Sequence, residues 1–140
     1  MDRAKILIAG GGIGGLTTAL SLHKAGFEVM VYESAPEIKP LGVGINLLPH
    51  AVRVLTNLGL QDAMADVAVA TRELIYFNKF GQQIWGEPRG IFAGYHWPQF
   101  SVHRGTFHML LLQKVKDTLG AERVLTGHHL LSCENKSDGV

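Results

Sequence analysis

Three observations near the N-terminus predict an α/β fold for this chain. A short apolar run, Lys5–Ala9, ends in the glycine cluster "GGGIGG". A helical pattern follows over Ile13–Ala25, and a second apolar run covers Phe27–Tyr32. A strand, a helix and a strand within about thirty residues predict a right-handed βαβ unit with parallel strands.

The composition limits the possible classes of protein. The chain has 140 residues, enough for one domain, and 46% of them are hydrophobic. A formal net charge of +1 gives no reason to expect nucleic acid or a membrane as a partner. The single cysteine, Cys133, cannot form an internal disulfide, so a reducing cytoplasmic location is expected. The histidines lack ligand spacing, so we predict no metal site.

Local patterns justify each N-terminal element. The apolar run bounded by glycine is typical of a buried parallel strand. In the helix, Leu16 and Leu20 share one apolar face, and Gly26 stands where a left-handed C-terminal cap is expected. The second strand ends at Glu33.

The later elements follow in chain order. Residues 34–47 are predicted as a loop, Pro49–Leu58 as a helix that begins at a proline and ends before Gly59, and residues 60–70 as a short helix. Further patterns predict two strands joined by a turn at Asn78–Gly81, an irregular stretch over 86–98, a strand at Phe100–His103, a helix at Thr106–Leu119, a strand at Arg123–Thr126 and the start of a strand at Leu130–Glu134. The closing "SDGV" indicates a hairpin turn whose return strand is missing.

The glycine cluster has the pattern G-x-G-x-x-G, formed by Gly10, Gly12 and Gly15. The first glycine allows a tight exit from the strand, the second lets a pyrophosphate approach the backbone, and the third lets helix and sheet pack closely. The helix N-terminus, with Ile13 and Gly14 in the same turn, offers unpaired N–H groups to a diphosphate.

Glu33 stands where a carboxylate accepts the ribose hydroxyls of a dinucleotide. Its charge would repel a 2′-phosphate, so NADP is not expected in this particular site. The alternative is a glycine-rich packing turn with a surface Glu33.

Several longer stretches carry a family resemblance. The chain resembles the FAD-binding part of the single-component flavoprotein aromatic hydroxylases, which include the p-hydroxybenzoate and salicylate hydroxylases. The resemblance is carried by "GGGIGGLTTALSLHKAGFEVMVYE", "LGVGINLLPHAVRVLTNLGL" and "SVHRGTFHMLLL". The stretches "RELIYFNKFGQQIWGEPRG" and "GYHWPQFSVHRG" resemble most the branch that acts on phenazine carboxylates and related aromatic acids. The resemblance implies a Rossmann-like FAD-binding fold of the glutathione-reductase type, here incomplete, with part of a substrate-side β-sheet.

The resemblance also implies further cofactor contacts. Gly42, Val43 and Gly44 would pass their backbone beside the ribityl chain and flavin ring, Arg104 would contact the phosphate–ribityl region, and Leu130 would offer backbone contacts to adenine. A loop-shaping role for the two glycines and a solvated arginine are the alternatives.

The resemblance divides the chain into three segments: residues 1–70 for FAD binding, 71–103 as a substrate-side β segment, and 104–140 as a return to the FAD-binding domain and the start of a β-meander. Aromatic side chains in and near the middle segment suit either a flat aromatic substrate or ordinary sheet packing; they are Tyr76, Phe77, Trp85, Tyr95 and Trp97.

The activity implied by the resemblance is hydroxylation of an aromatic carboxylate. NADH or NADPH would reduce FAD, and reaction with dioxygen would give a flavin C4a-hydroperoxide. We predict no catalytic acid, base or nucleophile, because the cofactor carries the chemistry. The expected partners are a small aromatic substrate and dioxygen, with an oligomer or a missing C-terminal part as further possibilities.

Two alternatives stay open. One is another flavoenzyme on the same scaffold, of the halogenase or prenyl-chain reductase type, although the Trp-rich signature of a halogenase is absent from the sequence. The other is a non-catalytic nucleotide-binding module. Members of the family are much longer, so we expect an N-terminal fragment or an interrupted reading frame. Alone, it is expected to bind FAD weakly, if at all, and to turn over no substrate.

Overall fold

The computed structural model describes residues 5–137 and 139–140. Contacts divide the chain into two compact units. Unit 1 holds the described residues up to Pro40 together with those from His108 onward, and unit 2 holds Leu41–Phe107. The division into cofactor and substrate segments at residues 70 and 103 stays a prediction.

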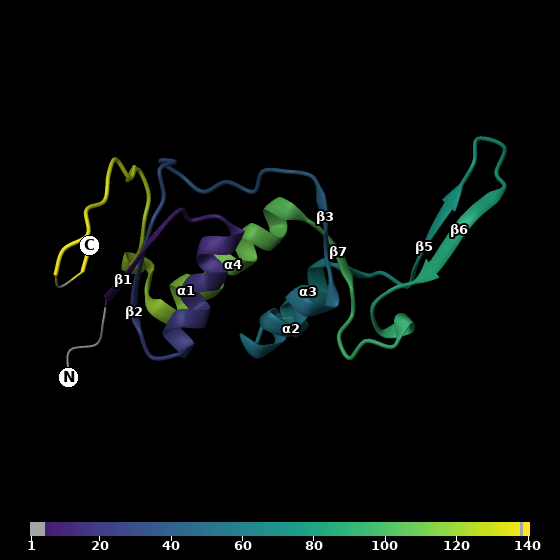
Figure 1. Cartoon of the computed structure of the whole chain (residues 1–140), viewed down its shortest axis with the longest axis horizontal. Helices are drawn as coiled ribbons and strands as arrows, with labels where there is room; N and C mark the ends of the chain where they lie inside the picture. The colour runs from purple at the N-terminus through teal and green to yellow at the C-terminus, as the bar shows by residue number, and fades with distance from the viewer. Residues whose placement is uncertain (1–4, 138) are drawn as a thin grey trace. The chain divides into compact units, whose positions relative to one another are not determined.

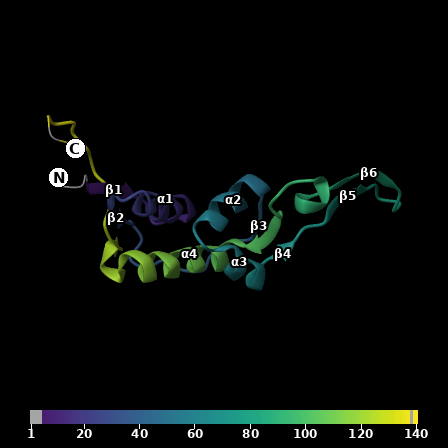
Figure 2. The ribbon, with the colours of Figure 1, turned by 90° about the horizontal axis from the view of Figure 1, so that it is seen from below.

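Unit 1 contains a parallel sheet with the strand order β1-β2-β8. Its elements are β1 (Lys5–Ala9), α1 (Ile13–Lys24), β2 (Glu28–Tyr32), the His108–Leu119 part of α4 (Arg104–Leu119), the 3₁₀ helix η2 (Ala121–Arg123) and β8 (Val124–Leu125). Both crossovers run in the same direction across the sheet, so right-handed connections place α1 and this part of α4 on one face. Figures 1 and 2 show both helices on the same side of β1 and β2. The predicted βαβ unit and Rossmann-like fold class are confirmed.

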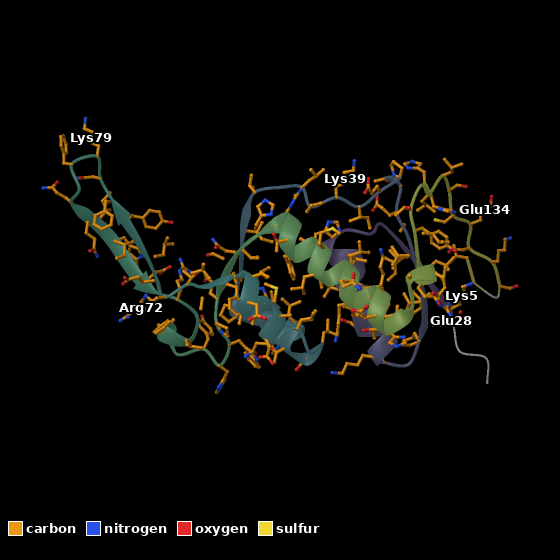
Figure 3. All side chains as sticks on the ribbon, turned by 180° about the vertical axis from the view of Figure 1, so that it is seen from behind. Lys5, Glu28, Lys39, Arg72, Lys79 and Glu134 are labelled. Atoms are coloured by element: carbon orange, nitrogen blue, oxygen red, sulfur yellow. The ribbon has the colours of Figure 1, made fainter. Side chains whose placement is uncertain are left out.

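Apolar side chains from both helices and from β2 form the core of unit 1. The fully or almost fully buried ones are Leu16, Ala19, Leu20, Val29, Val31, Leu111, Leu112 and Val115. At the sheet, Arg123 Nη1 lies 2.6 Å from Glu28 Oε1 and lowers the pKa of that carboxyl group. Lys5 pairs in register with Glu28 on the neighbouring strand and adds to this effect, and Figure 3 shows the two side by side.

Unit 2 combines two short helices with a small antiparallel sheet and a hairpin. Its elements are β3 (Gly44–Leu47), α2 (Pro49–Asn57), α3 (Gln61–Val67), β4 (Val69–Ala70), β5 (Glu73–Phe77), β6 (Gln83–Pro88), the 3₁₀ helix η1 (Gly90–Ala93) and β7 (Phe100–His103). Strands β3 and β4 both pair with β7, and β5 pairs with β6. Its buried core comprises Val52, Leu55, Leu60, Met64, Phe100, Val102 and Phe107.

The β5–β6 hairpin extends away from the helices of unit 2 (Figure 1). Figure 3 shows Arg72 at its base and Lys79 at its tip. Several of its large apolar side chains are exposed: Tyr76, Phe77, Phe80, Ile84 and Trp85. A two-stranded ribbon has no third strand or helix to cover its faces, which accounts for this exposure.

Several predicted elements differ from the structure, among them the short helix over 60–70, which ends at Val67 before strand β4 (Val69–Ala70). The expected loop at 34–47 contains β3, which forms only because residues Gly44–Leu47 pair with a strand far along the chain. Helix α4 begins at Arg104, two residues before the predicted start at Thr106. Leu130–Glu134 forms no strand, because no partner strand for it exists among the described residues.

Other local predictions hold. Gly26 and Gly59 both take left-handed φ values, +93° and +71°, two residues after the last residue of α1 and of α2. At the C-terminal turn, Lys136 N–H donates to Gly139 O at 2.7 Å, while Asp138 of the predicted "SDGV" turn lies outside the described residues. In the part of the chain that the structure describes, no helix has the length and apolar character needed to cross a membrane.

Candidate nucleotide-binding site

The glycine turn of unit 1 leaves β1 at the carboxyl end of the parallel sheet. Gly10 has a left-handed φ of +109°, which favours glycine over residues with a side chain. Its N–H donates to Tyr32 O at 2.7 Å, so the turn starts beside the last residue of β2. The chain then enters α1 at Ile13.

The glycines of the turn have different surroundings. A Cβ atom on Gly15 would overlap the carbonyl oxygen of Gly10, so α1 packs directly against the turn. At Gly12 and Gly14, no heavy atom lies within 4 Å of the place where a Cβ atom would stand. One glycine therefore serves close packing, and two leave the backbone open.

The N-terminus of α1 is not capped by a side chain of any described residue. Its N-cap residue is Gly12, and the first helical bond runs from Leu16 N–H to Gly12 O at 2.9 Å. The N–H groups of Ile13, Gly14 and Gly15 precede this bond and have no partner within the helix. They give this end a partial positive charge that suits an anionic ligand.

The Glu33 carboxylate lies against the glycine turn. Its Oε2 accepts a hydrogen bond from Gly11 N–H at 2.7 Å, and its Oε1 accepts from Ala35 N–H at 2.8 Å and from Ser34 Oγ at 3.2 Å. Glu33 therefore points toward the glycine turn. It is the first residue after β2, so the end of that strand brings its side chain to the turn.

These hydrogen bonds favour the ionised form of Glu33. The N–H of Ala35 has the largest effect, followed by the N–H of Gly11, and together they hold the pKa of the carboxyl group below its usual value of 4.5 against the opposing effect of burial. A carboxylate can accept about four hydrogen bonds. With three accepted from the protein, the half-buried Glu33 retains the capacity to accept a ligand hydroxyl.

His108, which the sequence analysis did not single out, also contacts the turn. Its Nε2 lies 2.7 Å from Gly11 O, and because a carbonyl only accepts, Nε2–H is the donor. The two residues are 97 positions apart, so no local pattern could have paired them. The sequence offers one clue to its role. His108 stands four residues after Arg104 on α4, so it follows a predicted cofactor residue by about one helical turn.

Leu130 lies in an irregular segment that follows β8. Nearby, Gly127 N–H donates to Ala35 O at 2.9 Å, and His128 N–H donates to Glu33 O at 2.9 Å. Leu130 is 61% exposed. The segment is thus anchored beside the Glu33 backbone two residues before the predicted adenine contact.

Unit 2 brings together the other four predicted cofactor residues. Gly42 has a φ of +128°, and a Cβ atom there would lie 2.5 Å from Arg104 Nε. Arg104 N–H donates to Val43 O at 2.9 Å, and Gly44 begins β3 with no heavy atom within 4 Å of a Cβ position. The guanidinium of Arg104 therefore packs over bare backbone at the start of β3.

Unit 1 thus has the features of a dinucleotide-binding α/β protein: an open glycine turn at a helix N-terminus, with a carboxylate from the end of the next strand lying on it. Residues 5–120 match the family model described as tryptophan halogenase. The chain belongs to this family, whose shared part is an FAD-binding domain.

The similar curated proteins are aromatic hydroxylases, which confirms the predicted resemblance. Phenazine 1,6-dicarboxylic acid hydroxylase PhzS from Lysobacter antibioticus is 52% identical over 136 residues, which cover 96% of this chain and 33% of the relative. The 3-hydroxybenzoate 6-hydroxylase of Polaromonas naphthalenivorans is 36% identical over 138 residues, covering 96% of this chain and 34% of the relative. The chain spans about a third of the length of these relatives.

Solved structures share the fold. Klebsiella pneumoniae HpxO, crystallised with FAD and uric acid, is similar at a TM-score of 0.77 and 24% identity, over 95% of this chain and 33% of HpxO. A C294A mutant of 2-methyl-3-hydroxypyridine-5-carboxylic acid oxygenase is similar at a TM-score of 0.77 and 25% identity, over 90% of this chain and 32% of that protein.

Proposed function

We propose that this chain is the FAD-binding part of an NAD(P)H-dependent monooxygenase that hydroxylates an aromatic carboxylate. The observation that carries the proposal is the Glu33 carboxylate on Gly11 N–H, beside the open backbone of Gly12 and Gly14. The names of the relatives support the substrate class, since they act on phenazine 1,6-dicarboxylic acid and 3-hydroxybenzoate.

The residues of unit 1 fit the adenosine diphosphate half of FAD. We assign the pyrophosphate to the uncapped N–H groups at Ile13 and Gly14, in a turn shaped by Gly10, Gly12 and Gly15. We assign the hydroxyls of the adenosine ribose to Glu33, and an adenine contact to the backbone of Leu130. The negative charge of Glu33 disfavours a 2′-phosphate in this site.

The residues of unit 2 fit the flavin half of the cofactor. We assign the ribityl chain and ring to the backbone of Gly42, Val43 and Gly44, with Arg104 as the cation for the phosphate–ribityl region. Support comes from contacts within this unit, where the guanidinium lies over Gly42 and Gly44 presents open backbone. A flat ring can approach such backbone because no side chain intervenes.

FAD, when bound, supplies the oxidation–reduction chemistry, with NADH or NADPH as the electron donor and dioxygen as the oxygen source. The chain itself supplies fixed N–H donors and a carboxylate that orient the cofactor. Glu33 is already bound to three protein donors, so it needs little rearrangement to receive a ribose.

Halogenation is the second candidate function, because the matching family model is described as tryptophan halogenase. We favour hydroxylation because the relatives named above are hydroxylases and cover 96% of this chain. The two functions are distinguished by the product that forms from an aromatic acid in the presence of chloride. Hydroxylation gives a phenol, and halogenation gives an aryl chloride.

An NMR titration of the 140-residue chain with FAD tests the cofactor assignment. We expect weak, saturable shifts of the amide signals of Gly10–Gly15, with ADP causing the same shifts. Adenosine 2′,5′-bisphosphate should bind less well than AMP, because its additional 2′-phosphate meets the Glu33 carboxylate. Saturable shifts confined to other parts of the folded chain would contradict the proposal.

We also propose a cytoplasmic location and an oligomeric holoprotein. An exposed free thiol, Cys133, suits a reducing compartment. A tetrameric form of 2-methyl-3-hydroxypyridine-5-carboxylic acid oxygenase, similar in fold, supports the possibility of assembly. Analytical ultracentrifugation at several protein concentrations tests the assembly.

A further inference from the structure

The β5–β6 hairpin of unit 2 has a free edge on each side. Within the part of the chain that the structure describes, β5 and β6 pair only with each other. Each strand therefore presents, on its outer side, a row of N–H and C=O groups that face no third strand. Such an edge pairs readily with another strand unless its own sequence hinders the pairing.

The outer edge of β6 carries two features that hinder pairing. Its register against β5 moves from Trp85 to Gln83 in one step, so Ile84 is the extra residue of a β-bulge. Pro88, the last residue of β6, has no N–H group to donate. Bulges and prolines are common means of protecting a sheet edge, so β6 is the protected side of the hairpin.

The outer edge of β5 carries neither feature. The strand sequence ELIYF includes no proline, glycine or lysine, and four of its five residues are apolar or aromatic. Directly before the strand, Arg72 O accepts from Arg89 N–H at 2.8 Å, so Arg72 faces the strand β6 side. Because inward and outward positions alternate along an antiparallel strand, the N–H and C=O groups of Glu73, Ile75 and Phe77 point outward. The β5 edge is therefore regular and open.

Two copies of this edge fit each other in antiparallel register. The three outward residues are centred on Ile75, so a two-fold axis there pairs Ile75 with Ile75 of the second copy, and Glu73 with Phe77. Glu73 is the only charged residue of β5, and in this register it meets no carboxylate of the second copy. The nearest charge across the pair is Lys79, two positions beyond Phe77, so the charges are complementary.

The hairpin also exposes apolar surface on the scale that an association needs. Five of its large side chains are each more than half exposed, namely Tyr76, Phe77, Phe80, Ile84 and Trp85. A large aromatic side chain has about 150–250 Å² of surface, so the five together expose roughly 500 Å². Stable interfaces bury about 600–1,000 Å² per partner, and the paired backbone of β5 adds to the side-chain area. A third and a fourth strand also supply the stability that a two-stranded ribbon lacks.

We infer that two copies of this chain associate through β5 and form a four-stranded antiparallel sheet. This pairing rests on the proposed assembly and gives it a surface and a partner, a second copy of the chain. It does not depend on FAD, because the hairpin lies in unit 2 and the glycine turn in unit 1.

Cysteine cross-linking tests the register. The single cysteine is first removed by Cys133→Ser, so that an introduced thiol is the only one. Two Ile75→Cys copies would have their Cα atoms about 5.5 Å apart, which is within the range of a disulfide. We expect mild oxidation to convert this variant into a disulfide-linked dimer at least about ten times faster than Ile84→Cys, the matched control on β6. Equal rates, or a faster reaction of Ile84→Cys, would overturn the inference.

Analytical ultracentrifugation tests the association in the chain without a new cysteine. The unmodified chain should sediment as a dimer in equilibrium with its monomer. Ile75→Lys places two like charges opposite each other on the two-fold axis, so the dissociation constant of the dimer should rise at least about tenfold, whereas Ile84→Lys should change it little.

The outcomes separate the two proposals, and the cross-linking rates keep the test valid even where Ile75→Lys disturbs folding. A dimer that is as strong in a folded Ile75→Lys chain overturns the role of β5 and leaves the proposed assembly standing. An unmodified chain that sediments as a monomer at every concentration overturns both. Failure of the FAD assignment appears elsewhere, at the amide signals of Gly10–Gly15.

Discussion

Glu33 and His108 bind the two polar groups of the same residue, Gly11. The carboxylate accepts from Gly11 N–H at 2.7 Å, and the imidazole Nε2–H donates to Gly11 O at 2.7 Å. Gly11 is buried and directly precedes the open Gly12. A strand end and a helix from opposite ends of the chain thus fix the backbone on which the proposed nucleotide lies.

The first prediction concerns His108. His108→Leu keeps a side chain of similar size but replaces the imidazole with an apolar group, so Gly11 O loses its donor. We expect the free energy of unfolding to fall by about 1 kcal/mol and FAD binding to weaken. Urea denaturation and the amide shifts of Gly11 and Gly12 are the measurements. His129→Leu, at an exposed histidine with no contact to the turn, is the control, and an equal loss in both variants would argue against the role of His108.

The second prediction is a pH dependence caused by Glu33. Its pKa in the folded chain is lowered below 4.5, so its stabilising contribution is complete above that value and is lost as the pH falls through the folded pKa. The difference in unfolding free energy between the unmodified chain and Glu33→Gln should therefore be largest at neutral pH and shrink under acid. Because the Glu28 pKa is also lowered, by Arg123, only this difference isolates Glu33. A difference that stays constant with pH would contradict the assignment.

The third prediction compares two glycines of α1. Gly15→Ala places a methyl group on the carbonyl of Gly10, so we expect a loss of about 1–3 kcal/mol in stability from overpacking. Gly14→Ala meets open space, and alanine is the better helix former, so it should be neutral or stabilise by up to about 1 kcal/mol. Thermal unfolding of both variants tests this, and a reversed order of stability would refute the packing described for the turn.

The fourth prediction concerns Gly42 and Arg104 in unit 2. Gly42→Ala forces a side chain into a φ of +128° and against the guanidinium, so we expect a loss of about 1–2 kcal/mol. Gly44→Ala, two residues on, meets no atom within 4 Å and should change stability by less than about 0.5 kcal/mol. Urea denaturation measures the free energy of unfolding of both variants. Equal losses would show that the left-handed φ of Gly42 and its contact with Arg104 do not cause the destabilisation.

Local sequence patterns were sufficient for much of unit 1. The apolar run at Lys5–Ala9, the glycine cluster and the second run at Phe27–Tyr32 predicted β1, α1 and β2 because these elements are close in sequence and pair with each other. Glu33 was found for the same reason, since its place at the end of a strand sets its direction.

Pairing between distant residues was not predictable in the same way. Strand β3 exists because Gly44 pairs with His103 and Leu47 with Phe100, and nothing in a glycine- and proline-rich stretch indicates such a partner. The His108 bond to Gly11 also depends on a contact between separate segments.

The fifth prediction tests the central claim most directly. It compares the FAD affinity of the Gly12→Ala chain with that of the unmodified chain, both measured by NMR titration. The added methyl group meets no protein atom within 4 Å, so the fold and its thermal unfolding should be retained. The account predicts that FAD binding falls at least about tenfold, because the methyl group occupies the space of the pyrophosphate. A folded Gly12→Ala chain that binds FAD as well as the unmodified chain would contradict it.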